Sequence, residues 1–81
     1  MYTPHTWGDG LLLLANLHVA AALSDGAYVE FPYDPPTWTP ERRDFLLPET
    51  VVADGEGYVS LSDRPGLGID LDWAPLERLR I

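Results

Sequence analysis

The chain has 81 residues, enough for one small domain, and its 13 acidic and 5 basic residues give a formal net charge of −8. It has no lysine and no cysteine, which excludes disulfides, thiolate metal sites and lysine Schiff-base chemistry within the chain. Because it is acidic and has no basic cluster, we expect neither nucleic acid nor an anionic membrane as a partner.

The first predicted element is a helix from about Gly10 to Leu23, which is rich in leucine and alanine. Asp9 is a suitable N-cap, and Ser24-Asp25-Gly26 is a suitable stop. The helix is apolar nearly all round, so we expect it to be buried on most faces. Its apolar run is shorter than the roughly 20 residues that span a membrane, and no cationic segment of a secretory signal precedes it. These features favour a soluble, cytoplasmic protein.

Residues 27–33 are predicted to form a strand because they contain tyrosine, valine and phenylalanine. With Tyr2–His5 as the tail of an earlier strand, the order is strand, helix, strand. Such a unit is expected to have parallel strands and a right-handed crossover. The prolines at 35 and 36 mark a weak boundary after this unit.

The second half is predicted to be irregular, with short elements. Thr39 as N-cap and Pro40 at the first helical position indicate a short helix. Residues 49–62 read as a β-hairpin around Asp54-Gly55-Glu56-Gly57, and residues 63–70 as a loop. Residues 72–81 have apolar positions at helical spacing and predict a short amphipathic helix at the end of the chain.

Two residues are candidates for acid–base chemistry. His5 follows the first predicted strand, and Glu30 lies in the second. Parallel strand–helix–strand units carry functional residues at the carboxyl ends of their strands, and neighbouring strands lie about 4.8 Å apart. An imidazole and a carboxylate placed there are natural acid–base partners. The alternative is that His5 belongs to the helix entry and Glu30 is a solvated strand residue.

Other polar and aromatic residues favour structural roles. His18 lies inside the apolar helix and fits a core or interface histidine better than a metal ligand. The turn Gly8-Asp9-Gly10 fits an ordinary helix entry better than an anion site, since Asp9 fills the cap. The three tryptophans are interpreted as packing anchors, and Arg42-Arg43 as a solvated pair. The run Pro65–Gly68 lacks the lysine and the spacing of a phosphate loop.

Three stretches, taken in order, resemble one known family. They are PHTWGDGLLLLANLHVAAAL at 4–23, YVEFPYDPP at 28–36 and VVADGEGYVSLSDRPGLGIDLD at 51–72. Together they resemble the C-terminal end of the enolase superfamily, in its mandelate racemase/muconate lactonizing enzyme branch. The resemblance covers nearly the whole chain.

The resemblance implies an α/β fold. Residues 1–36 would be the strand–helix–strand end of a (β/α)8 TIM barrel, and residues 37–81 a β-hairpin and short helix that rejoin a capping domain. It also implies abstraction of the proton α to a carboxylate, with Mg²⁺ stabilising the enediolate. His5 matches the family's general acid/base histidine. Glu30 matches the glutamate that hydrogen-bonds the substrate carboxylate and stabilises the enediolate.

The departures from the family pattern concern the metal site. The family's three carboxylate metal ligands and the aspartate that orients its histidine have no counterpart in this sequence. We therefore expect no metal ligands in this chain and no enolase-type activity from the chain alone. A full barrel needs about 250 residues, so the missing barrel and a small carboxylate or acid-sugar substrate are expected partners in the full-length context.

Three functional hypotheses remain open. The first is a segment of a Mg²⁺-dependent racemase, epimerase or dehydratase that uses His5 and Glu30. The second is a non-catalytic remnant, or an interaction module that self-associates as a homo-oligomer through its apolar helix. The third is a small unrelated enzyme that uses these two residues alone, which the sequence supports least because no residue anchors a substrate or metal.

Overall fold

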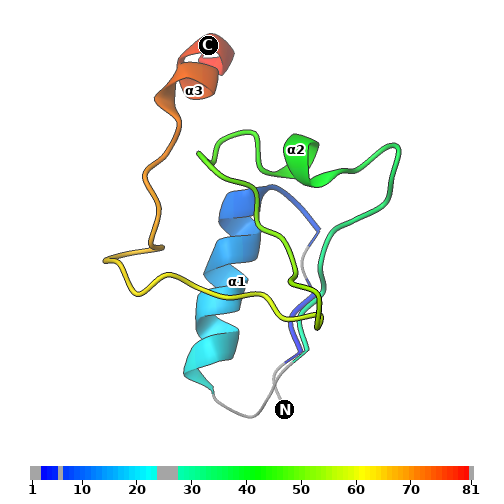
Figure 1. The fold of residues 1–81 in the computed structure, drawn as a ribbon. Helices are drawn as coiled ribbons and strands as arrows, with labels where there is room; N and C mark the ends of the chain where they lie inside the picture. The colour runs from blue at the N-terminus through cyan, green and yellow to red at the C-terminus, as the bar shows by residue number, and fades with distance from the viewer. Residues whose placement is uncertain (1–2, 6, 24–27, 81) are drawn as a thin grey trace.

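The computed structural model describes residues 3–5, 7–23 and 28–80. Within these ranges it contains the helices α1 (Gly10–Ala22), α2 (Pro40–Arg43) and α3 (Trp73–Leu79). Figure 1 shows α1 as the central element, with extended chain running beside it and α3 lying away from it near the C-terminus. No helix of the described residues is long and apolar enough to cross a bilayer.

The sequence prediction for α1 is confirmed, including its cap. Asp9 is in the extended conformation, and its Oδ1 accepts a hydrogen bond from the backbone N–H of Leu12 at 3.1 Å. This bond satisfies one of the four backbone donors that a helix leaves unpaired at its start. The helix ends at Ala22, with Leu23 as C-cap. The predicted stop at Ser24-Asp25-Gly26 lies outside the described residues.

One face of α1 is buried and another is exposed. The buried residues follow helical spacing and are Gly10, Leu13, Leu14, Leu17 and Ala20. On the other side Leu12, Val19 and Leu23 keep 46–50% of their surface exposed. The expectation that α1 is buried on most faces is therefore wrong for this chain, because its irregular segments cover only one side of the helix.

The core joins the two halves of the sequence. Leu13, Leu14 and Leu17 of α1 pack with Leu47, which follows α2. Partly buried side chains from before and after position 36 pack around this cluster, namely Leu11, Val29, Phe31, Val51, Val59, Leu61, Ile69 and Leu71. Removal of this apolar surface from water is the main force that holds the irregular segments against α1.

The two short helices follow their capping signals. Thr39 Oγ1 accepts from the Arg42 N–H at 3.3 Å, and Pro40 occupies the first turn of α2. At α3, Asp72 Oδ1 accepts from the Ala74 N–H at 3.2 Å. The sequence predicts both helices, and both are confirmed.

The predicted sheet is wrong. The described residues contain no strand pair beyond one isolated antiparallel bridge between Asp34 and Trp38, which brackets a cis bond between Pro35 and Pro36. Residues 28–33, predicted as part of a strand, run as a drawn-out segment beside α1 in Figure 1 but have no partner in a ladder. Residues 3–5 are also outside any strand, and Tyr2 lies outside the described residues. The strand–helix–strand barrel end is therefore not formed, because a strand needs a neighbour for its backbone hydrogen bonds.

The predicted hairpin is also wrong, although its turn forms. The Asp54 N–H donates to the Tyr58 carbonyl at 2.8 Å, and the Gly57 N–H donates to the Asp54 carbonyl at 3.0 Å. Gly57 has a φ of +86°, which glycine adopts without a Cβ penalty. The flanking residues do not continue this pairing into a ladder. Turn chemistry is local, whereas a hairpin also needs cross-strand pairs to stabilise it.

Candidate functional site

The structure brings the two predicted site residues together. His5 lies in the segment before α1 and Glu30 in the extended segment that follows it. His5 Nδ1 lies 2.7 Å from Glu30 Oε2, which is hydrogen-bond distance. The His5 side chain is 82% exposed and the Glu30 side chain 35% exposed, so the pair sits at the surface, where a small molecule can reach the imidazole.

The contact selects one tautomer of the neutral imidazole. An ionised carboxylate only accepts hydrogen bonds, so Nδ1 of His5 carries the hydrogen that Glu30 accepts. In the neutral ring, Nε2 then keeps its lone pair and is the basic nitrogen. A carboxylate that orients a histidine in this way is a recurring part of acid–base catalysis. The geometry therefore supplies one oriented base at the surface.

The resemblance implies a different role for Glu30 from the contact seen here. That role is a hydrogen bond to a substrate carboxylate, whereas here the Glu30 carboxylate bonds the histidine. The family's orienting aspartate has no counterpart in the sequence, and in the structure it is the Glu30 carboxylate that contacts His5 Nδ1. Sequence reasoning found both residues but not this relation, since it depends on how two distant segments lie side by side.

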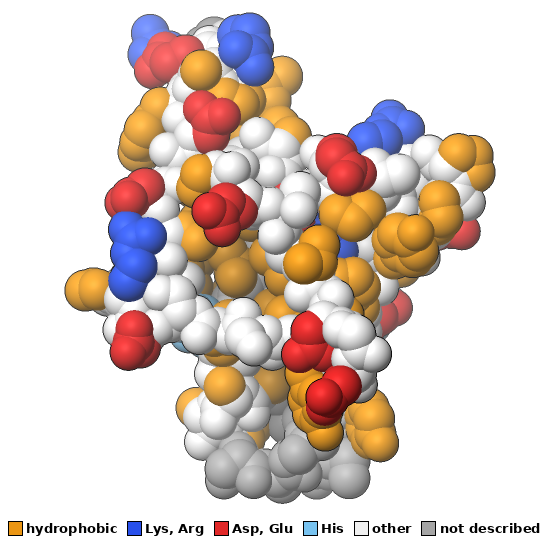
Figure 2. Space-filling model, viewed as in Figure 1, with side chains coloured by type: hydrophobic (Ala, Val, Ile, Leu, Met, Phe, Trp, Pro, Cys, Tyr) orange, Lys and Arg blue, Asp and Glu red, His pale blue; other side chains and the backbone are white. Residues whose placement is uncertain are grey.

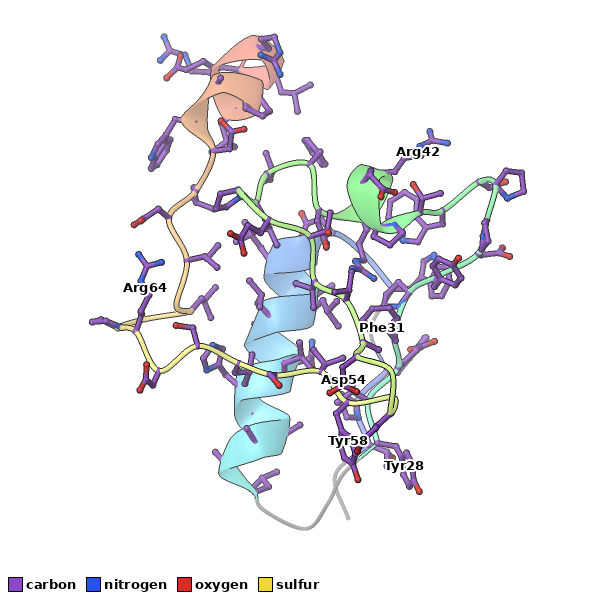
Figure 3. The ribbon with its side chains drawn as sticks, viewed as in Figure 1. Tyr28, Phe31, Arg42, Asp54, Tyr58 and Arg64 are labelled. Carbon is purple, nitrogen blue, oxygen red and sulfur yellow. The ribbon has the colours of Figure 1, made fainter. Side chains whose placement is uncertain are left out.

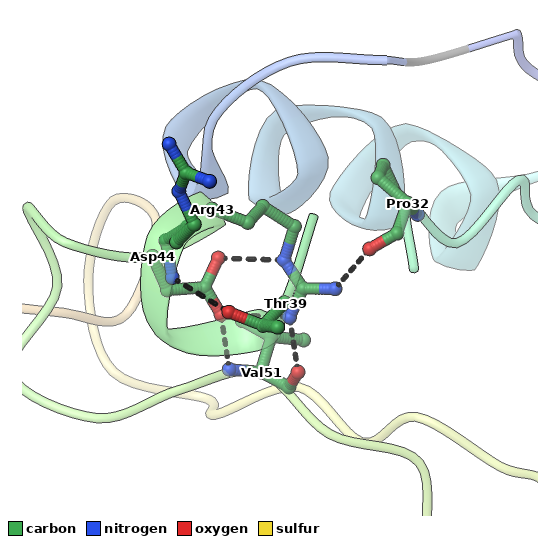
Figure 4. A network of polar contacts seen from close by, with 6 residues as sticks. Pro32, Thr39, Arg43, Asp44 and Val51 are labelled. Atoms are coloured by element: carbon green, nitrogen blue, oxygen red, sulfur yellow. Dashed lines mark hydrogen bonds and ion pairs between the residues drawn. The ribbon is translucent and has the colours of Figure 1, made fainter. Parts of the chain in front are cut away.

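A buried ion pair lies near the site and was missed by the sequence analysis. Arg43 and Asp44 both have side chains with no exposed surface, and their contact is bidentate (Figure 4). Nε of Arg43 donates to Oδ1 and Nη2 donates to Oδ2, each at 2.7 Å. The interpretation of Arg42-Arg43 as a solvated pair is right for Arg42, which is exposed, and wrong for Arg43. The spacing of the sequence could have indicated this burial. Leu46 and Leu47 follow Arg43 by three and four residues, and both are buried.

His18 has the structural role that the sequence favours. It is half-buried, and its Nε2 donates to the Leu67 carbonyl at 3.0 Å. Leu67 lies in the turn closed by the hydrogen bond from the Gly68 N–H to the Pro65 carbonyl at 3.1 Å. This bond fastens the glycine-rich loop to α1.

The tryptophans do not all anchor the core. Trp7 is 51% exposed and Trp73 is 65% exposed, so for these two residues the packing interpretation is wrong. Trp38 is half-buried, and its indole Nε1 is buried without a hydrogen-bond partner.

An open apolar groove of about 820 Å³ runs between α1 and the two segments beside it. It is lined by Leu17 and Ala20 of α1 and by residues of 28–31 and 53–61. Figure 3 shows Tyr28 and Tyr58 near each other at one end of these segments, and both are more than two-thirds exposed. Figure 2 shows further hydrophobic side chains at the surface, between acidic groups.

The described residues do not fit a magnesium ion. No group of three or more histidine, aspartate or glutamate side chains lies close enough together in the described part of the chain to hold a metal. The His5–Glu30 pair offers one nitrogen and one carboxylate, whereas Mg²⁺ prefers an octahedral shell of oxygen ligands.

The sequence of the chain was compared with family models, curated proteins and solved structures. The family model described as enolase C-terminal domain-like matches residues 1–75. The chain belongs to this family, and the resemblance seen in the sequence is confirmed at the level of the enolase superfamily. No curated protein and no solved structure gives a significant match.

Proposed function

We propose that this chain serves an enolase-superfamily enzyme that abstracts the proton α to a carboxylate, as a racemase, an epimerase or an acid-sugar dehydratase. His5 is the general acid/base, and Glu30 orients it. The observation that carries the proposal is the 2.7 Å contact between His5 Nδ1 and Glu30 Oε2 on an exposed imidazole. Membership of the enolase C-terminal domain-like family supports the proposed reaction class.

His5 carries the proton, and Glu30 stabilises the charge that His5 gains. Nε2 of His5 accepts the α-proton of a small carboxylate or acid sugar, and the ring becomes an imidazolium. The Glu30 carboxylate stabilises that positive charge through Nδ1–H. In dehydration the imidazolium then gives the proton to a departing hydroxyl group. In racemisation or epimerisation an acid on the opposite face of the carbon, which the proposal assigns to residues outside those described, would deliver a proton there. Positioned acid–base groups of this kind contribute about 10²–10⁴-fold to a rate.

The superfamily generally uses Mg²⁺, but the described residues do not form a site for it. The proposal therefore assigns the metal ligands to residues outside those described here. The family's three carboxylate ligands have no counterpart in this sequence, so we expect the 81-residue chain alone not to catalyse α-proton exchange. The activity requires the remainder of the enzyme, including whatever other segments contribute the carboxylates.

The test measures hydrogen exchange at the α-carbon. The chain, and separately the longest product of the reading frame that contains it, are incubated in D₂O with Mg²⁺ and a panel of hydroxy acids and acid sugars. Proton NMR then follows loss of the α-proton signal. We expect exchange only from the longer product, and a loss of about 10²-fold or more in its His5→Asn variant.

The matched control is His18→Gln, which replaces the other histidine by a residue that can still donate to the Leu67 carbonyl. This variant should retain exchange. Full activity of the longer product carrying His5→Asn would refute the assignment of His5. Exchange by the 81-residue chain alone would refute the assignment of the metal ligands to other residues.

A second function is favoured by a separate observation, the exposed apolar face of α1. We propose as the alternative that the chain is a non-catalytic module that self-associates through Leu12, Val19 and Leu23, which are about half exposed. Light scattering across a concentration series tests it. Concentration-dependent dimers that Val19→Glu abolishes, without exchange activity in any product, would favour this alternative over the enzyme.

A further inference from the structure

The buried ion pair of Arg43 and Asp44 ties α2 to two other segments of the chain. Beyond its bonds to Asp44, Arg43 donates from Nη1 to the Pro32 carbonyl at 2.9 Å and from Nη2 to the Val51 carbonyl. Asp44 Oδ2 in turn accepts from the Val51 N–H at 2.6 Å. Figure 4 shows these bonds converging on the guanidinium and carboxylate. One fully buried residue therefore fixes the backbone at positions 32 and 51.

Position 32 is two residues from the glutamate of the candidate site. The guanidinium of Arg43 also lies over the ring of Phe31, 4.5 Å from its centroid, so residue 31 is held as well. Because Arg43 is buried on all sides, its planar group cannot turn without losing bonds to several partners at once. The segment that carries Glu30 is thus held at two consecutive residues.

Because the backbone at residues 31 and 32 is held and the segment is drawn out, the side on which the Glu30 side chain lies is also determined. Successive side chains of an extended segment point to opposite sides. Val29 and Phe31 pack against the core, whereas Tyr28 is 81% exposed. Glu30 lies between the two inward residues and meets His5 on the outer side. A rotation of this segment would turn Phe31 away from Arg43 and Glu30 away from His5 together.

We propose that Arg43 is a positioning residue for the His5–Glu30 pair, acting through Phe31 and Pro32. The catalytic importance of this role rests on the proposed function. The role itself can be measured without any activity, from the tautomer of His5. Arg43 is fully buried, and its side chain bonds to Asp44, Pro32 and Val51 rather than to His5. It holds the backbone so that the Glu30 carboxylate accepts from Nδ1 and leaves Nε2 as the base.

The test reads the tautomer of His5 in the full chain without substrate or metal. Nitrogen-15 NMR of the imidazole distinguishes Nδ1–H from Nε2–H. Glu30→Ala sets the baseline without the carboxylate. The variant Arg43→Met with Asp44→Leu removes both buried charges, and Arg43→Lys keeps the charge but loses the planar fork. Circular dichroism selects the variants that fold.

We expect folded Arg43 variants to lose the Nδ1–H preference and to approach the tautomer ratio of Glu30→Ala. Arg42→Met is the matched control, since Arg42 is the neighbouring arginine of α2 but is exposed, and it should keep the wild-type ratio. Wild-type ratios in a folded Arg43→Lys chain would overturn the proposal, and that variant decides the matter if the double variant does not fold. Absence of α-proton exchange in every product would instead refute the proposed function and leave the tautomer result standing.

Discussion

Substitution of Gly10 by alanine should destabilise the chain, although it places a better helix former in α1. Alanine is favoured over glycine in a helix by about 1 kcal/mol. A Cβ on Gly10, however, would lie 2.6 Å from Leu47 Cδ1 and closer still to Asp44 Oδ1. Leu47 is only 7% exposed, and Asp44 Oδ1 is held by Arg43 Nε at 2.7 Å. Neither atom can move without disturbing the core or the buried ion pair.

The magnitude follows from these opposing effects. Overpacking a core costs about 1–3 kcal/mol, and separation of a buried ion pair costs about 3–5 kcal/mol. A partial displacement of Asp44 should thus outweigh the gain in helix propensity and leave a net loss of about 1–2 kcal/mol in the free energy of unfolding. For a domain of this size, each kcal/mol lowers the melting temperature by about 4–8 °C.

Urea titration followed by circular dichroism measures this change in the free energy of unfolding. Gly55→Ala is the control, because a Cβ added at Gly55 would meet no atom within 4 Å and the residue has an ordinary φ. It should be neutral or stabilising by about 0.4–1 kcal/mol, through the lower entropy of the unfolded chain. If Gly10→Ala proves as stable as the wild type or more so, the close packing of α1 against Asp44 is refuted.

Three further substitutions test the fold, each by thermal unfolding. Asp9→Ala removes the cap of α1 and should cost about 1 kcal/mol, and an unchanged melting temperature would show that the cap contributes nothing. Leu13→Ala should cost about 2–5 kcal/mol, because Leu13 is 0% exposed. Its control is Leu12→Ala, at a site that is 47% exposed. Equal losses in the two variants would contradict the burial of only one face of α1. Arg64→Ala should change stability by less than about 1 kcal/mol, since its 2.8 Å contact with Asp70 is solvent-exposed, and a larger loss would mean that the loop supports the core.

The helices were predictable because their signals are local. Asp9, Thr39 and Pro40 define helix starts within a few residues of sequence, and each does so in the structure. The strand at 27–33 was predicted from its tyrosine, valine and phenylalanine content, which is a weaker signal than a cap. The strand prediction failed because a strand needs a paired neighbour, which the composition of one segment cannot identify.

The two residues of the candidate site could be predicted from the sequence, but the buried ion pair that holds the backbone beside them could not. His5 and Glu30 were selected by their residue types and positions, and the structure places them in contact. Arg43 and Asp44 are adjacent charges in a polar stretch, and such residues are almost never fully buried unless they are paired. The spacing to Leu46 and Leu47 hints at the burial of Arg43, but the contacts with Pro32 and Val51 that complete the burial are between distant residues.

The weakness of the His5–Glu30 contact explains why its support matters. Exposed ion pairs contribute only about 0–1 kcal/mol, so this pair cannot hold two segments together by its own attraction. Its geometry must be imposed from both sides by buried groups. On one side Gly10 lets the start of α1, five residues after His5, approach Asp44 closely. On the other side Arg43, which is paired with Asp44, holds the backbone beside Glu30. Asp44 is therefore the point at which both constraints on the acid–base pair meet.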